Sequence, residues 1–196
     1  MNGTALTTAI PHQRYPPGDL AIWIFILAEL LVFAVFFAAY AFARSGDVAL
    51  FNTYQDTLDR RAALINTLAL ITASFFVVRA VAAIREDDPR GCTRWLLAAI
   101  GMGLVFVVVK GGEYAHHLAQ GIHLGTNTFY MFYLSLTFFH FMHVLLGLVI
   151  LAAVALKAHR GGYGAAEHTG VETGGAYWHM VDLVWLILFP LVYVMR

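Results

Sequence analysis

Five long apolar stretches divide the chain, and they limit its fold more than any other feature of the sequence. A helix needs about 20 mostly apolar residues to cross the hydrocarbon core of a bilayer, and each stretch is long enough. The sequence lacks the short segments of alternating polar and apolar residues that are typical of transmembrane β-barrels. We therefore expect an all-α bundle of five transmembrane helices. The predicted helices are residues 19–44, 62–84, 95–117, 128–157 and 175–196.

The composition agrees with a membrane protein and argues against several other classes. A chain of 196 residues with 60% hydrophobic and 12% charged residues carries too much apolar surface for one soluble core. The connections between the apolar stretches are short, so we expect residues 1–196 to form a single membrane domain. Lys and Arg total 12, as do Asp and Glu, and this balance argues against nucleic acid as a partner. Cys92 has no second thiol with which to form a disulfide or a cysteine metal site.

Basic residues near the ends of the predicted helices indicate how the chain is oriented. With a cytoplasmic N-terminus, six Lys and Arg residues lie on the inner side of the membrane and four lie on the outer side. Because basic residues accumulate on the cytoplasmic side, this count favours a cytoplasmic N-terminus and a C-terminus on the opposite side.

Five ionisable side chains interrupt the apolar stretches, and each needs a partner or a function because hydrocarbon disfavours charge. They are Glu29, His140, His143, His179 and Asp182. At about 1.5 Å per residue, Glu29 lies near the middle of the membrane, and the other four lie at one level in its inner half. We therefore expect the two histidines of the fourth helix to meet the polar pair of the fifth helix.

Several interpretations of these polar groups are open from the residues alone. In the first, they hydrogen-bond across helix interfaces and have a structural role. In the second, His140, His143 and His179 bind a metal in a small metal-dependent membrane enzyme, since imidazole is a ligand of iron, copper and zinc. A third possibility, a proton-conducting membrane protein, would need polar residues spread along a path, whereas here they cluster. We favour the structural role and expect no metal site.

Glu29, and the pair formed by Lys110 and Glu113, raise separate questions. Glu29 has no cation close to it in the sequence, so desolvation favours its neutral form, and both a proton relay and a buried hydrogen-bond donor are open. Lys110 and Glu113 are three residues apart near the outer end of the third helix. For them we expect a local ion pair in which the lysine head extends to the membrane interface.

Five short motifs occur in an order that is typical of one family of membrane proteins. They are AELLVF at 28–33, NT at 66–67, EY at 113–114, FHFMHV at 139–144 and YWHMVDLVWL at 177–186. Together they resemble subunit III of the haem-copper oxidases, and the motif at 177–186 is the most specific. The number of helices resembles the short bacterial form, which occurs in quinol oxidases and in the subunit-III-like protein associated with nitric oxide reductases.

The resemblance implies a non-catalytic membrane subunit of a terminal oxidase or of a nitric oxide reductase. Such a subunit binds no haem and no metal itself, and it packs beside a catalytic subunit that carries the haem. Its first two helices splay from the other three and leave a cleft that holds phospholipid. It supports the stability and the proton uptake of the catalytic subunit and protects the active site during turnover. The resemblance also implies the bacterial inner membrane, with the N-terminus cytoplasmic and the C-terminus periplasmic.

The resemblance also implies roles for individual residues. Glu29 matches the family's buried glutamate at the lipid cleft, which is related to proton uptake. The polar positions of the last two helices, which are structural in the family, match His140, His143, His179 and Asp182. Arg79 and Arg85 are the candidates for holding a phospholipid headgroup on the inner side. Ala28 stands where a serine usually precedes the glutamate, and Lys110 also departs from the family pattern.

Overall fold

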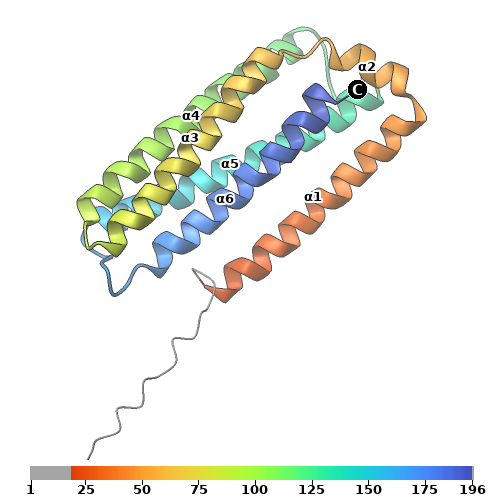
Figure 1. Cartoon of the computed structure of the whole chain (residues 1–196). Coiled ribbons are helices and arrows are strands. Elements are labelled where there is room, and N and C mark those ends of the chain that lie inside the picture. Colours follow the sequence, from red (N-terminus) through yellow and green to blue (C-terminus); the bar gives the residue numbers. More distant parts are fainter. Residues whose placement is uncertain (1–18, 196) are drawn as a thin grey trace, which may run out of the picture.

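The computed structural model describes residues 19–195, so the first 18 residues of the expected single domain and Arg196 lie outside the described part. Helices make up most of the described chain, and five of them are long and apolar enough to cross a membrane, as predicted (Figure 1). In chain order the elements are α1 (Leu20–Gly46), α2 (Val48–Gln55), α3 (Arg60–Arg85), α4 (Pro89–Ala119), α5 (Thr128–His159), α6 (Thr169–Phe189) and the π-helical turn η1 (Pro190–Val194).

The helices extend past the predicted apolar stretches because polar residues cap them. α4 begins six residues before the predicted start, since Pro89 suits the first turn of a helix and the Asp88 carboxylate accepts a hydrogen bond from Gly91 N at 2.8 Å. The connection between the first two long helices contains a short helix of its own. Asp47 caps the short helix α2 there, and α2 buries Phe51 and Gln55 against the bundle.

Helices α3, α4, α5 and α6 form a four-helix bundle in which each helix packs against two neighbours. α1 lies outside this bundle, where it packs on α6 and on α5 (Figure 1). α3 packs on both α4 and α6, whereas the contacts of α1 with the bundle are fewer. The small side chains that α3 and α4 bury, among them Ala73, Ala80 and Ala99, allow these two helices to approach closely.

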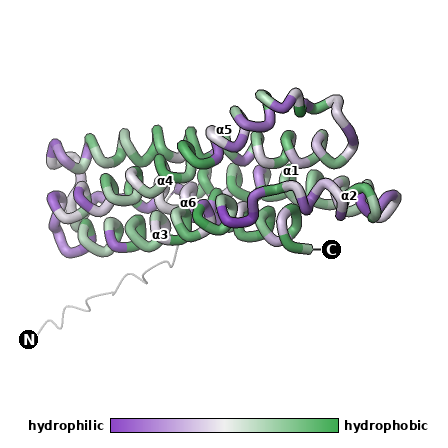
Figure 2. The backbone as a smooth tube through the Cα atoms, turned by 90° about the horizontal axis from the view of Figure 1, so that it is seen from above, coloured by the Kyte–Doolittle hydropathy of each residue, from purple (hydrophilic) through white to green (hydrophobic). Residues whose placement is uncertain are grey.

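α1 contacts the bundle through one narrow seam. Its buried residues are Ile26, Phe33 and Tyr40, which are seven residues apart and therefore share one face of the helix. Large apolar residues on its other faces are exposed; Leu27 and Leu31, for example, are 65% and 66% exposed. Hydrophobic residues predominate along the long helices and hydrophilic ones gather near the helix ends (Figure 2), which is the distribution that a bilayer requires.

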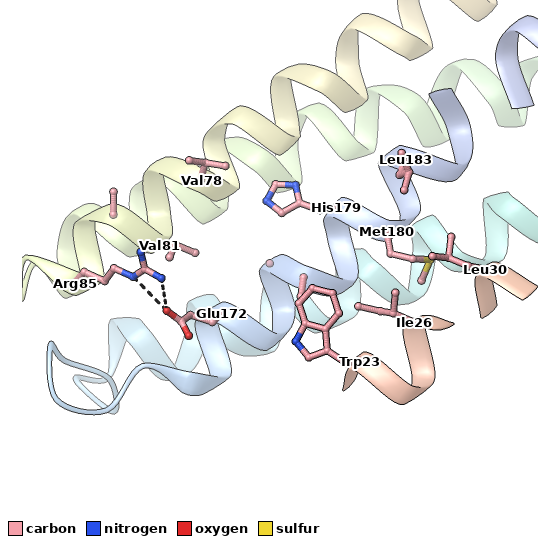
Figure 3. Close-up of a pocket in the computed structure, with 13 residues that line it drawn as sticks. Trp23, Ile26, Leu30, Val78, Val81, Arg85, Glu172, His179, Met180 and Leu183 are labelled. Atoms are coloured by element: carbon pink, nitrogen blue, oxygen red, sulfur yellow. Dashed lines mark hydrogen bonds and ion pairs between the residues drawn. The ribbon is translucent and has the colours of Figure 1, made fainter. Parts of the chain in front are cut away.

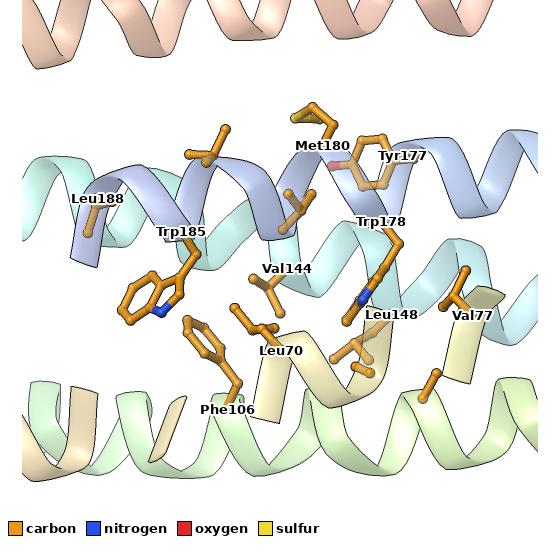
Figure 4. Close-up of a cluster of buried hydrophobic side chains, with 14 of the residues drawn as sticks. Leu70, Val77, Phe106, Val144, Leu148, Tyr177, Trp178, Met180, Trp185 and Leu188 are labelled. Carbon is orange, nitrogen blue, oxygen red and sulfur yellow. The ribbon is translucent and has the colours of Figure 1, made fainter. Parts of the chain in front are cut away.

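Two tryptophans of α6 form the centre of the bundle, where they lie among Leu70, Phe106 and Val144 (Figure 4). Trp178 is fully buried and fits against two glycines. A Cβ atom at Gly103 would lie 2.8 Å from its ring, and one at Gly147 would lie 3.0 Å from it. Glycine at both positions therefore leaves the room that the indole occupies.

Candidate functional site

Glu29, in the middle of α1, hydrogen-bonds to His143 of α5. Glu29 Oε2 lies 3.1 Å from His143 Nε2, and the two side chains are 21% and 11% exposed. His143 Nδ1 lies 2.7 Å from the Phe139 carbonyl oxygen, which can only accept, so Nδ1 carries a proton. The contact at Nε2 therefore holds one further proton, either as carboxylic acid and imidazole or as carboxylate and imidazolium. One proton is therefore shared between these two side chains.

Asp182 and His140 lie in different surroundings from this pair. Asp182 Oδ2 accepts a hydrogen bond from Ser74 Oγ on α3 at 2.7 Å. His140 is fully buried between the rings of Phe106 and Trp185, with centroid distances of 5.6 and 5.1 Å. Neither His140 nitrogen has a hydrogen-bond partner within residues 19–195.

The expected contact between the α5 histidines and the α6 pair is thus not formed in the described part of the chain. His140 and His143 are three residues apart, so their side chains leave α5 in different directions. One of them reaches α4 and α6, and the other reaches α1. The three histidines of the metal-enzyme alternative also have different surroundings. Among residues 19–195, no group of three or more His, Cys, Asp or Glu side chains is placed to hold a metal ion.

A groove of about 470 Å³ lies between α1 and α3, with α6 as its floor. Most of its lining is apolar and includes Trp23 and Ile26 of α1, while His179 of α6 also faces it (Figure 3). At one end Arg85 and Glu172 form an ion pair with an N–O distance of 2.5 Å. The groove therefore combines a mostly apolar lining with a charged pair at one end.

The two arginines considered for a lipid headgroup differ in position. Arg85 lines the groove, where Glu172 is its ion-pair partner. Arg79 does not line the groove, and its guanidinium lies over the ring of Trp95, 5.4 Å from the centroid. Geometry thus favours Arg85 of the two.

A second polar cluster surrounds Lys110, and sequence reasoning missed most of it. The Lys110 side chain is fully buried, and its Nζ donates to Glu113 Oε2 at 3.0 Å, Tyr133 Oη at 3.0 Å and Tyr193 Oη at 2.6 Å. The three N–H groups of the ammonium thus have three acceptors. Both hydroxyls also donate to Glu113 Oε1, with Tyr193 at 3.2 Å from it.

The ion pair predicted between Lys110 and Glu113 is present, but the expectation that the lysine extends to the interface is wrong. The physical reason is that the tyrosines come from α5 and η1, 23 and 83 residues along the chain, and satisfy the ammonium inside the bundle. Pro190, which has no N–H, begins the π-helical turn that brings Tyr193 to the cluster. The sequence offered one indication of the cluster, a lysine with a glutamate three residues later. It did not show that Tyr133 and Tyr193 are the other partners of this lysine.

Comparison with known proteins adds the deciding observation. The family model described as "Cytochrome c oxidase subunit III" matches residues 18–196. The chain belongs to this family. A protein from Thermostichus vulcanus named "Cytochrome c oxidase subunit 3" is 35% identical over 194 residues, which cover 98% of this chain and 94% of that protein. A similarly named protein from a Synechocystis strain is 33% identical, covering 100% of this chain and 88% of its own length.

One relative differs in architecture. An Aeropyrum pernix protein named "Heme-copper oxidase subunit I+III" is 29% identical over 94% of this chain, which corresponds to 24% of that longer protein. Membership of the family confirms the resemblance to subunit III of the haem-copper oxidases. It identifies the chain as a multi-pass membrane protein and a non-catalytic subunit of an oxidase, and does not favour the metal-dependent enzyme.

Proposed function

We propose that this chain packs beside the haem-bearing catalytic subunit I of a haem-copper oxidase and stabilises it in the membrane. The observation that carries this proposal is the family match over residues 18–196. The fused Aeropyrum relative supports it, because one polypeptide there carries both subunit names. The named relatives are oxidase subunits, which supports oxygen rather than nitric oxide as the electron acceptor of the complex.

Phospholipid is the proposed occupant of the groove between α1 and α3. The groove is apolar along its length, as acyl chains require, and Arg85 at its mouth offers a cation to a phosphate. Glu172 competes for the same guanidinium, so a bound phosphate either replaces this carboxylate or shares the arginine with it. Basic residues near the helix ends support a cytoplasmic N-terminus and a periplasmic C-terminus. The bacterial relatives named subunit 3 support the bacterial inner membrane as the location.

Glu29 and His143 are proposed to supply proton-related support to the catalytic subunit. The pair is only partly exposed, holds one exchangeable proton, and joins α1 to the four-helix bundle. These properties suit a group that takes up or releases a proton beside the catalytic subunit, although Ala28 provides no hydroxyl next to the glutamate.

The lipid proposal is tested on the complex purified in mild detergent, with bound phospholipid counted by native mass spectrometry. Ala176 lines the groove, so Ala176→Leu should displace lipid, whereas Ala153→Leu on an exposed face of α5 should not. Arg85→Gln and Glu172→Gln both break the ion pair, but only the first removes the cation. Lipid loss in Arg85→Gln with retention in Glu172→Gln supports the headgroup site; equal loss in both variants contradicts it.

A further inference from the structure

We infer that Tyr133 and Glu113 form a redox-active pair, in which Tyr133 gives up one electron while its phenolic proton moves to Glu113. The inference does not depend on the proposed partner or on lipid binding. It rests on the hydrogen bonds of the cluster around Lys110 and on the oxidisable rings that lead to it. Tyrosine and tryptophan are the oxidisable aromatic side chains of proteins, and a tyrosine is oxidised most readily when a base accepts its proton.

The hydrogen bonds provide the proton acceptor. The Tyr133 hydroxyl donates to Glu113 Oε1, and Lys110 Nζ lies 3.0 Å from Tyr133 Oη. When an electron leaves Tyr133, its O–H bond breaks and a new O–H bond forms on the Glu113 carboxylate. Lys110 continues to donate to the phenoxyl oxygen, so that this oxygen keeps a polar partner in the buried site. The electron reduces an oxygen-centred radical, such as a peroxyl radical, which takes a proton from solvent and becomes a hydroperoxide.

A series of oxidisable rings leads through this pair. Trp185 lies 6.4 Å from Tyr193, and Tyr193 lies 6.1 Å from Tyr133, measured between ring centroids. The series continues from Tyr133 to Tyr130 at 6.3 Å and from Tyr130 to Tyr54 at 5.4 Å. It therefore runs from the tryptophan centre of α6 (Figure 4) to α2, where Tyr54 is partly exposed. Tyr133 and Tyr193 both donate to Glu113 Oε1, and Tyr133 is the one of the two that continues the series to Tyr130 and the partly exposed Tyr54.

A structural role alone does not require this combination of groups. Buried ion pairs can often be replaced by apolar residues of similar volume without loss of stability, so stability by itself gives no reason for a lysine here. Tyr177 provides an internal comparison. It is also buried, but its hydroxyl donates to the His143 backbone oxygen at 3.2 Å, which cannot accept a proton in the same way.

The test uses the full chain in detergent with a flash-generated ruthenium tris-bipyridine oxidant and persulfate, followed by freeze-quench electron paramagnetic resonance. The wild type should give a tyrosyl radical that forms more slowly in deuterium oxide, because the proton moves with the electron. Tyr133→Phe and Glu113→Gln should each lose most of this signal. Tyr177→Phe, the matched control, should keep it.

A tyrosyl signal unchanged in both Tyr133→Phe and Glu113→Gln would overturn the inference, as would a signal lost equally in Tyr177→Phe. Circular dichroism establishes whether each variant is folded. If Tyr133→Phe does not fold, Glu113→Gln decides the matter, because it keeps the phenol and removes the proton acceptor. A full signal in folded Glu113→Gln, without a deuterium effect, would then be the contrary result.

Discussion

Glu29 Oε2 of α1 lies 3.1 Å from His143 Nε2 of α5, which places a hydrogen bond in the middle of the one long helix that stands outside the four-helix bundle. The two residues are 114 positions apart in the chain. α1 otherwise holds to the bundle chiefly through the apolar seam of Ile26, Phe33 and Tyr40. We therefore expect this polar contact to contribute to how firmly α1 is attached.

Replacing Glu29 should separate the effect of hydrogen bonding from that of packing. Glu29→Leu leaves His143 Nε2 without its partner, at a cost of about 1 to 3 kcal/mol, whereas Glu29→Gln keeps hydrogen-bonding capacity and should lose less. Thermal unfolding in detergent, followed by tryptophan fluorescence, measures the difference. Leu27→Met, on an exposed face of the same helix, controls for a side-chain change that breaks no hydrogen bond. Equal stability of the Leu and Gln variants would show that the contact adds nothing.

The Asp182 carboxylate is expected to stabilise the contact between α6 and α3 through Ser74. Asp182→Leu leaves the Ser74 hydroxyl without this acceptor, while Asp182→Asn keeps one, so Asn should be tolerated better. The two sites interact directly, and Ser74→Ala combined with Asp182→Leu should therefore be less destabilising than the sum of the single changes. The proposed phenotype is loss of the subunit from the complex, with turnover persisting at first. If Asp182→Leu leaves assembly intact but stops turnover at once, a structural role is refuted.

Breaking the buried ion pair between Lys110 and Glu113 should destabilise the bundle more than the changes above. Lys110→Met leaves the mostly buried Glu113 carboxylate without its cation, and breaking such a pair costs about 3 to 5 kcal/mol. Adding Glu113→Leu removes the stranded charge, so the double variant should recover part of the loss. Lys157→Met, at an exposed position of α5, should change the unfolding temperature little. A double variant less stable than Lys110→Met would argue against this account.

Two glycines of α4 test the packing around Trp178. A Cβ at Gly103 would lie 2.6 Å from Leu148 and 2.8 Å from Trp178, so Gly103→Ala should destabilise the bundle by about 1 to 3 kcal/mol. A Cβ at Gly101, two residues earlier in α4, would have no neighbour within 4 Å. Gly101→Ala should therefore be neutral or stabilising, because alanine has a higher helix propensity than glycine. Calorimetric unfolding in detergent compares the pair. The reverse order of stability would show that the ring does not require the glycine.

The five helices could be predicted from the sequence because the thickness of a bilayer sets their length and the composition sets their surroundings. The partners of the polar residues could not. Their distance along the chain hides them, as with Glu29 and His143, and the direction in which each side chain leaves its helix decides the contact. His140 and His143 were assigned to one network because they are three residues apart, but that spacing points them at different helices.

The cluster at Lys110 shows the same limit more sharply. Its i, i+3 spacing to Glu113 predicted the local ion pair, which is present. The Lys110 ammonium remains inside the bundle because Tyr133 and Tyr193 accept its hydrogen bonds. Tyr193 lies in the π-helical turn that begins at Pro190. Neither the tertiary contact nor the altered helix geometry has a local sequence signature beyond the proline itself.

The central claim, that this chain is an accessory subunit held beside a catalytic subunit, is tested most directly by purifying it through an affinity tag from its native membrane in mild detergent. Mass spectrometry identifies the proteins that accompany it, and an optical spectrum records haem in the complex and in the chain after separation. We predict that a large haem-copper oxidase subunit accompanies the tagged chain in stoichiometric amount, and that the haem absorbance stays with that subunit. Haem absorbance in the separated chain, or a tagged chain purified without any such partner, would contradict the account.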